Sequence, residues 1–154
     1  MVEARPDRPD VITLSIPSRL ELLSLLDQLT DSISSRLDFT DEERSAISLS
    51  VVEAGTNAIQ HGHKADGVTP VDVRYELGRD RLTVVVHDRG KGFQPPDLEH
   101  TPDVTSPEHL LDARGRGIFI MRSCMDQVSF DFSGGGTTVR LIKIRHTNGD
   151  RPHS

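Results

Sequence analysis

Two pairs of short, strand-like segments, each joined by a tight turn, constrain the fold of this chain more than any other feature. The segments VDVRYEL (71–77) and LTVVVHD (82–88) flank the turn-forming letters GRDR, and VSFDF (128–132) and TTVRLIKI (137–144) flank SGGG. Because a short turn joins only antiparallel strands, we expect a mainly antiparallel sheet.

The rest of the chain adds one more strand and several helices to this plan. VITLSI (11–16) alternates as a strand does, and leucines then recur at helical spacing from Leu22 to Leu29. A short apolar helix is expected over roughly 116–126. We therefore predict an α+β fold, a two-layer sandwich with helices on one face of a mainly antiparallel sheet.

A further helix carries the most informative polar pattern. Thr40 is a good N-cap, and Glu43 three residues later completes a capping box, while Gly62 is placed to end the helix in a left-handed conformation. Glu53 and Asn57 are four residues apart and so share one helical face. A carboxylate beside a carboxamide on an otherwise packable helix indicates a site that holds a ligand.

The chain of 154 residues has the length of one domain. Residues 1–10 and 146–154 are polar and contain Pro or Gly, so we expect disordered tails around a domain that spans 11–145. The segment 93–114 is rich in Pro, Asp, Glu and His, and a loop of that length is typical of a mobile lid or a functional segment.

Composition excludes several classes of protein. A net charge of −6, with no Trp and one Tyr, argues against direct nucleic-acid binding. No apolar run approaches the ~18 residues of a membrane span, and the N-terminus has no apolar signal core, so we expect no membrane contact and a cytoplasmic location. The single cysteine, Cys124, rules out an internal disulfide and a cysteine cluster for zinc. Among the histidines, only His61, one turn beyond Asn57, is expected to be more than a surface or packing residue.

The letters DRGKGF follow the second strand of the first hairpin. Asp88 ends that strand and can accept a hydrogen bond from an amino group, and Gly90 and Gly92 allow the backbone to turn and a ligand to approach closely. The alternative is a simple turn with a capping aspartate.

A second glycine pair occurs in RGRGIFIM. Gly115 and Gly117 are expected to precede the short helix, whose N-terminal N–H groups can bind phosphate, and Arg114 and Arg116 add positive charge. The alternative is a lid hinge with solvated arginines. The run GGGTT (134–138) reads either as a hairpin turn or as backbone that comes close to a ligand.

Taken in order, these four motifs resemble those of the GHKL or Bergerat-fold ATPases, which include gyrase, the Hsp90 chaperones and histidine kinases. The motifs are Glu-x3-Asn-Ala-x2-His-Gly, Asp-x-Gly-x-Gly-Phe, Arg-Gly-Arg-Gly-Ile-x-Ile-Met and Gly-Gly-Thr-Thr. The chain is most similar to the small bacterial anti-sigma factor serine/threonine kinases of the RsbW type, over approximately residues 11–144.

The resemblance implies a role for each motif. Asn57 would coordinate the Mg²⁺ that bridges the ATP phosphates, Glu53 would act as general base on the incoming hydroxyl, and Asp88 would accept from the adenine amino group. An ATP lid would cover about 93–116. The other candidate nucleotide-binding residues are Gly90, Lys91, Gly92, Arg114, Gly115, Arg116, Gly117 and Thr137, of which the two arginines are proposed from their charge alone.

The resemblance also implies partners. It implies an ATP- and Mg²⁺-dependent serine/threonine kinase and anti-sigma factor that binds a sigma factor and phosphorylates an antagonist of the STAS class in a partner switch. A homodimer is usual in this type. The alternative is a non-catalytic module that uses ATP to shape its lid and sequester a partner.

Overall fold

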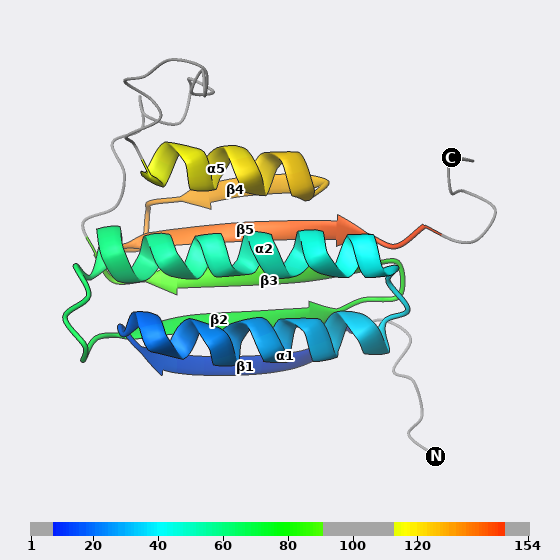
Figure 1. Ribbon diagram of the computed structural model, residues 1–154, viewed down its shortest axis with the longest axis horizontal. Helices are drawn as coiled ribbons and strands as arrows, with labels where there is room; N and C mark the ends of the chain where they lie inside the picture. Colours follow the sequence, from blue (N-terminus) through cyan, green and yellow to red (C-terminus); the bar gives the residue numbers. More distant parts are fainter. Residues whose placement is uncertain (1–7, 91–112, 147–154) are drawn as a thin grey trace.

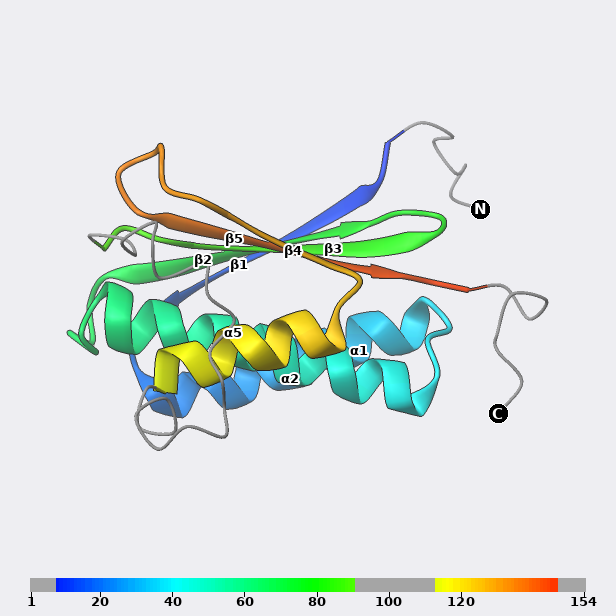
Figure 2. The same cartoon turned by 90° about the horizontal axis from the view of Figure 1, so that it is seen from above.

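The computed structural model describes residues 8–90 and 113–146, and in these ranges five strands and three α-helices form two layers (Figure 1). The strands are β1 (Asp10–Pro17), β2 (Pro70–Leu77), β3 (Arg81–Asp88), β4 (Gln127–Asp131) and β5 (Thr137–Ile144). The α-helices are α1 (Leu23–Arg36), α2 (Asp41–Asn57) and α5 (Ala113–Cys124). All three cover the same face of the sheet (Figure 2), which confirms the predicted α+β sandwich.

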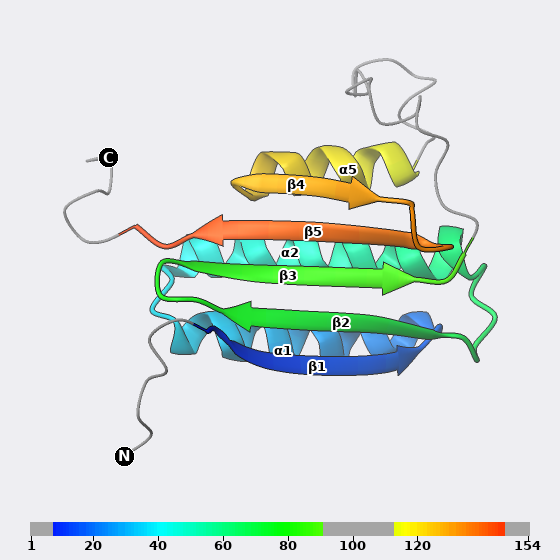
Figure 3. The ribbon, with the colours of Figure 1, turned by 180° about the vertical axis from the view of Figure 1, so that it is seen from behind.

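Every neighbouring pair of strands is antiparallel, in the order β1-β2-β3-β5-β4. The turn of the first predicted hairpin is closed by the Gly78 N–H, which donates to the Arg81 carbonyl at 3.0 Å. The second hairpin places β5, rather than β4, against β3 (Figure 3). This order sets Asp88, the last residue of β3, directly across from Thr137, the first residue of β5.

The core lies between the helices and the inner face of the sheet. Tyr75 is fully buried there, and its hydroxyl forms a 2.8 Å hydrogen bond with the Thr30 hydroxyl of α1. Burial raises the pKa of Tyr75 to about 12, so the phenol stays neutral and the bond holds α1 over β2. The largest other fully buried side chains are Leu26, Ile47, Ile59, Leu82, Met121 and Leu141.

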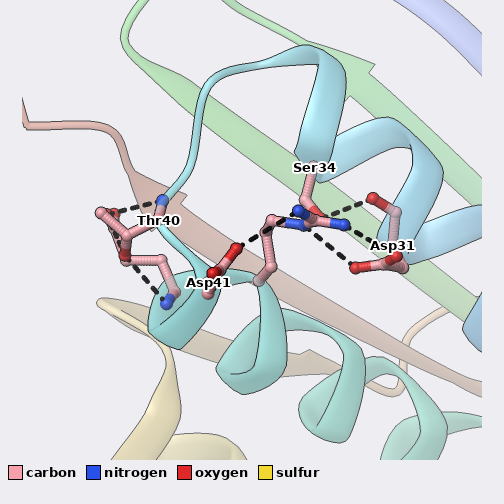
Figure 4. A network of polar contacts seen from close by, with 6 residues as sticks. Asp31, Ser34, Thr40 and Asp41 are labelled. Atoms are coloured by element: carbon pink, nitrogen blue, oxygen red, sulfur yellow. Dashed lines mark hydrogen bonds and ion pairs between the residues drawn. The ribbon is translucent and has the colours of Figure 1, made fainter.

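Helix α2 begins as the sequence predicts. The Glu43 N–H donates to Thr40 Oγ1 and the Thr40 N–H donates to Glu43 Oε1, both at 3.2 Å, so the capping box is confirmed (Figure 4). Arg44, the residue after Glu43, pairs with Asp31 of α1 at 2.9 Å and with Asp41 at 3.4 Å. These contacts connect the start of α2 to α1.

The predicted end of α2 is wrong in its geometry. After Asn57 the chain continues into a π-helical turn, η2 (Ala58–Gly62), in which the His63 N–H donates to the Ala58 carbonyl. Gly62 does not have a positive φ; the left-handed residues are Lys64 and Ala65, both at φ 51°. Gly62 is needed for a close contact with Asp88, described below, and not for a left-handed cap.

The predicted start of α5 is also wrong. The helix begins at Ala113, so Gly115 and Gly117 lie in its first two turns and not ahead of it. A glycine inside a helix costs about 1 kcal/mol relative to alanine. The contact that Gly117 makes with α2 accounts for its presence there.

Lys91, Gly92 and most of the predicted lid and tails lie outside the described residues. β1 begins at Asp10, one residue inside the predicted N-terminal tail. In the part of the chain that is described, no helix combines the length and the apolar character needed to cross a membrane.

Candidate functional site

The polar pair of α2 lies against α5. Asn57 is buried, with 6% of its surface exposed, and Glu53 one turn earlier is half-buried. A Cβ atom on Gly117 would lie 2.9 Å from Glu53 Oε2 and 3.2 Å from Asn57 Nδ2. Helix α5 therefore covers both groups, and a side chain at position 117 would press against them.

The side-chain amide nitrogen of Asn57, Nδ2, is buried without a hydrogen bond to any of the described residues. An unsatisfied buried polar group costs about 1–3 kcal/mol, so native proteins retain few of them without a functional reason. Rotation of the side-chain amide presents either its nitrogen or its oxygen to a ligand.

A divalent cation at this position would have few protein ligands. Within residues 8–90 and 113–146, no three His, Cys, Asp or Glu side chains gather as a metal cluster. Mg²⁺ accepts one or two protein oxygens when substrate phosphates and water complete its coordination. The Asn57 carboxamide fits that requirement, and a metal that needs a full protein cage does not fit here.

The electrostatic environment of Glu53 has two opposing parts. Burial raises the pKa of the Glu53 carboxyl above its ordinary value, and the positive charge of Arg116 opposes this with a smaller effect. A carboxylate with a raised pKa is a stronger proton acceptor. The structure thus brings the predicted Glu53 and Arg116 into electrostatic contact beside Asn57.

The second half of the site lies at the adjoining ends of β3 and β5. Asp88 is 5% exposed and its Oδ1 accepts the Gly90 N–H at 2.9 Å. Thr137, 1% exposed, stands opposite Asp88 in the strand register. The structure therefore brings together Asp88, Gly90 and Thr137, which the sequence analysis assigned to nucleotide binding from two separate motifs.

Three glycines, which we call the glycine cradle, surround Asp88: Gly62 of η2, Gly90 after β3, and Gly136 before β5. A Cβ on Gly62 would lie 2.6 Å from the Asp88 carboxyl carbon, one on Gly90 would overlap the Gly62 carbonyl, and one on Gly136 would overlap the Asp88 carbonyl. The backbone of η2, the residues after β3 and the residues before β5 therefore lie so close together that a side chain at any of the three glycine positions would collide with a neighbouring segment. All three glycines occur in motifs that are visible in the sequence, but no local spacing predicts that they pack around Asp88.

His63 is a residue that the sequence analysis missed. His61, which was expected to matter, is exposed, while the His63 ring is 8% exposed and has partners at both nitrogens. Its Nδ1 is 2.7 Å from Ser18 Oγ, and its Nε2 accepts the Arg89 N–H at 2.8 Å. No local signal predicts this, because the partners are 45 and 26 residues away in the chain.

The two halves are connected by η2 (Ala58–Gly62), which follows directly on Asn57, the last residue of α2. Asn57 belongs to the half under α5, and Gly62 belongs to the glycine cradle.

Gly115 and Arg114 are in the first turn of α5, and the side chain of Arg114 lies outside the described part of the structure. The arrangement places a buried acceptor, Asp88, near one end of η2 and the buried Asn57 carboxamide at the other.

The chain is similar to known proteins over most of its length. The family model described as "Histidine kinase-like ATPase domain" matches residues 16–143. The chain is similar to proteins named serine-protein kinase RsbW from three species. The Bacillus licheniformis relative is 33% identical over 139 residues, covering 88% of this chain and 86% of the relative. The corresponding values are 30% over 145 residues (92% and 89%) for Bacillus subtilis and 31% over 145 residues (90% and 88%) for Listeria monocytogenes.

The fold is also similar to a crystal structure of the RsbU and RsbW domains of a Mycobacterium tuberculosis protein. The TM-score is 0.60 at 13% identity. The match covers 88% of this chain but only 32% of that longer chain. At this identity the likeness concerns the fold alone.

Proposed function

The chain belongs to the family of histidine kinase-like ATPase domains, and on that premise we propose that it is an ATP- and Mg²⁺-dependent protein serine/threonine kinase that also acts as an anti-sigma factor. The observation that carries the proposal is the half-buried Glu53 beside Asn57 under α5, where the Asn57 amide nitrogen has no hydrogen-bond partner among the described residues. Relatives that match nearly the whole chain are named serine-protein kinases, which supports the same activity.

The base of ATP is proposed to bind at the ends of β3 and β5. Asp88 uses Oδ1 to accept the Gly90 N–H, and an ionised carboxylate has acceptor positions left for the adenine amino group. Its burial keeps competing water away and makes the interaction selective. Thr137, across from Asp88, is proposed to contact the same base.

The phosphates are proposed to lie toward Asn57. The Asn57 carboxamide would hold Mg²⁺, which when bound supplies positive charge that neutralises the phosphate oxygens. Arg116, whose charge already acts on Glu53, supplies further positive charge near this position. Arg114, Gly115, Lys91 and Gly92 remain candidate contacts to the nucleotide.

Glu53 is proposed to be the general base. Its carboxylate would take the proton of a serine or threonine hydroxyl as that oxygen bonds to the γ-phosphorus and the bond to the β-phosphate oxygen breaks, leaving ADP. The raised pKa of Glu53 supports this role, because a more basic carboxylate accepts the proton more readily.

The protein substrate is proposed to be a small antagonist of the STAS class, and the second partner a sigma factor. Phosphate adds about −1.5 to −2 charges to the antagonist, and this weakens its complex with a kinase of net charge −6. The sigma factor would then be bound in its place. A homodimer remains part of the proposal.

The test of the proposed function is phosphotransfer. The protein is incubated with labelled Mg·ATP and the STAS-domain protein encoded nearest its gene. We expect label on a single Ser or Thr of that protein. ATP binding without any labelled product would mean either that the kinase has a different substrate or that the protein is the ATP-gated binding module.

Replacing Asp88 with asparagine is expected to weaken ATP binding by about 1–3 kcal/mol, because the amide puts a donor where the adenine amino group needs an acceptor. Isothermal titration calorimetry measures this loss. Asp27→Asn, on the exposed face of α1, is the control and is expected to bind ATP normally. An unchanged affinity in Asp88→Asn would remove Asp88 from the base-binding site.

Substitutions at Gly117 are expected to lower phosphotransfer in a graded way. The alanine Cβ meets the flexible end of Glu53, which can move slightly, so Gly117→Ala should have a small effect. Gly117→Val adds two methyl groups against Glu53 and Asn57, and displacing such groups by about 1 Å can cost 10²-fold in rate. Single-turnover transfer rates check the order, and equal rates in the two variants would contradict it.

A further inference from the structure

We propose that His63 is a positioning residue that fixes the base-binding end of the site, acting in one tautomer through the main-chain amide of Arg89. The inference rests on the proposed function, because it takes Asp88 as the residue that binds the base. It goes beyond the four motifs, none of which assigns a role to His63.

The hydrogen bonds determine the tautomer. A main-chain N–H can only donate, so His63 Nε2, 2.8 Å from the Arg89 nitrogen, is the acceptor. In a neutral imidazole the proton is then on Nδ1, which donates to Ser18 Oγ at 2.7 Å. The Ser18 hydroxyl in turn donates to the Thr69 carbonyl at 2.6 Å. In this series of three hydrogen bonds every donor meets an acceptor, and only the tautomer with the proton on Nδ1 of His63 allows all three bonds.

The ring is held on the Ser18 side by residues that flank β1 and β2. Ser18 is fully buried and His63 is 8% exposed, so solvent has little access to these bonds. Ser18 follows β1, Thr69 precedes β2, and both lie at the end of the sheet where η2 ends. His63 is therefore anchored to the scaffold by one nitrogen and presents the other to the loop after β3.

The amide that His63 holds belongs to the peptide between Asp88 and Arg89. The carbonyl of this peptide packs against Gly136, and its N–H donates to His63, so both ends of the peptide plane are fixed. The next N–H, of Gly90, donates to the Asp88 carboxylate itself. The orientation of that carboxylate thus depends on a peptide whose rotation His63 prevents.

Two substitutions separate this role from simple core filling. In His63→Gln the side-chain oxygen replaces Nε2 and can accept the Arg89 N–H. In His63→Asn the side-chain nitrogen replaces Nδ1, which keeps only the Ser18 contact. Both variants remove the ring, so both are expected to lower Tm to a similar extent.

ATP affinity distinguishes the two variants. We expect His63→Asn to raise the Kd and KM for ATP about tenfold, the effect of one lost hydrogen bond, with kcat nearly unchanged. His63→Gln is expected to stay within about twofold of the wild type, since the bond to Arg89 is kept. Amide hydrogen exchange at Arg89, measured without ATP, should be faster in His63→Asn than in His63→Gln.

Equal ATP affinity in the two variants, at similar Tm, would overturn the positioning role and leave His63 as packing. Faster exchange at Arg89 in His63→Asn with unchanged ATP affinity would overturn it as well, because the held amide would not matter to the ligand. Failure of the proposed function appears separately, as a wild-type protein that binds no ATP, and that result would overturn this inference too.

Discussion

Replacing Glu53 with glutamine is expected to lower the rate of phosphotransfer by about 10²–10⁴-fold, the usual contribution of a general base. Glutamine has nearly the same size as glutamate but cannot take the hydroxyl proton. ATP binding should change little, because the proposed nucleotide contacts are made by other residues. Single-turnover transfer from labelled ATP and calorimetric ATP binding measure the two effects separately.

The same substitution is expected to stabilise the fold at neutral pH. Because burial raises the pKa of Glu53, the native state binds this proton more tightly than the unfolded chain does. The stabilisation from that proton is complete below the ordinary value of 4.5 and is lost as the pH rises through the raised native value. At pH 7 the charged carboxylate destabilises the native state, so Glu53→Gln should have the higher Tm there. A lower Tm at pH 7 would contradict this.

The control for Glu53→Gln is Glu42→Gln, an exposed glutamate on the same helix. It removes the same charge from α2 and is expected to leave phosphotransfer unchanged. If both variants transferred phosphate at the wild-type rate, Glu53 would not be the base.

Gly136→Ala is expected to abolish tight ATP binding, whereas Gly134→Ala, two residues earlier, should have no effect. The alanine Cβ at position 136 would overlap the Asp88 carbonyl, and because this is backbone it cannot rotate away. Either β5 or the Asp88–Arg89 peptide must move, and we expect the loss of ATP affinity to exceed the roughly tenfold effect of one lost hydrogen bond. A Cβ at position 134 has no atom within 4 Å.

Calorimetric ATP titration and thermal unfolding of both alanine variants test the glycine cradle. Gly134→Ala should remain within about 0.5 kcal/mol of the wild-type stability, as surface substitutions usually do. Equal behaviour of the two variants would show that the β4–β5 hairpin moves freely away from β3, so the contact at Gly136 would not shape the site.

The features that could be predicted from the sequence are those whose residues lie close together along the chain. Thr40 and Glu43 are three residues apart, and Glu53 and Asn57 are four apart. The geometry of a single helical turn therefore determines how each pair lies. The strand pairs were equally local, since a short turn fixes the direction of its two strands.

The glycine cradle and His63 could not be predicted in this way. Whether Gly136 is a turn residue or a packing residue depends on which peptide lies against it, and the Asp88 peptide is nearly fifty positions earlier in the chain. The start of α5 was misjudged for the same reason. Two glycines indicate a helix end by propensity, but the close contact of Gly117 with α2 outweighs that local preference.

The π-helical turn η2 determines what a one-residue deletion between Asn57 and Gly62 would do to the site. A π turn closes with one residue more than an α turn, so deleting any residue between Asn57 and Gly62 would let the helix continue in its regular form. The deletion would also rotate everything after it by about 100°, which would move Gly62 away from Asp88. Such a deletion would therefore make the backbone of this helix more regular and at the same time take the glycine cradle apart.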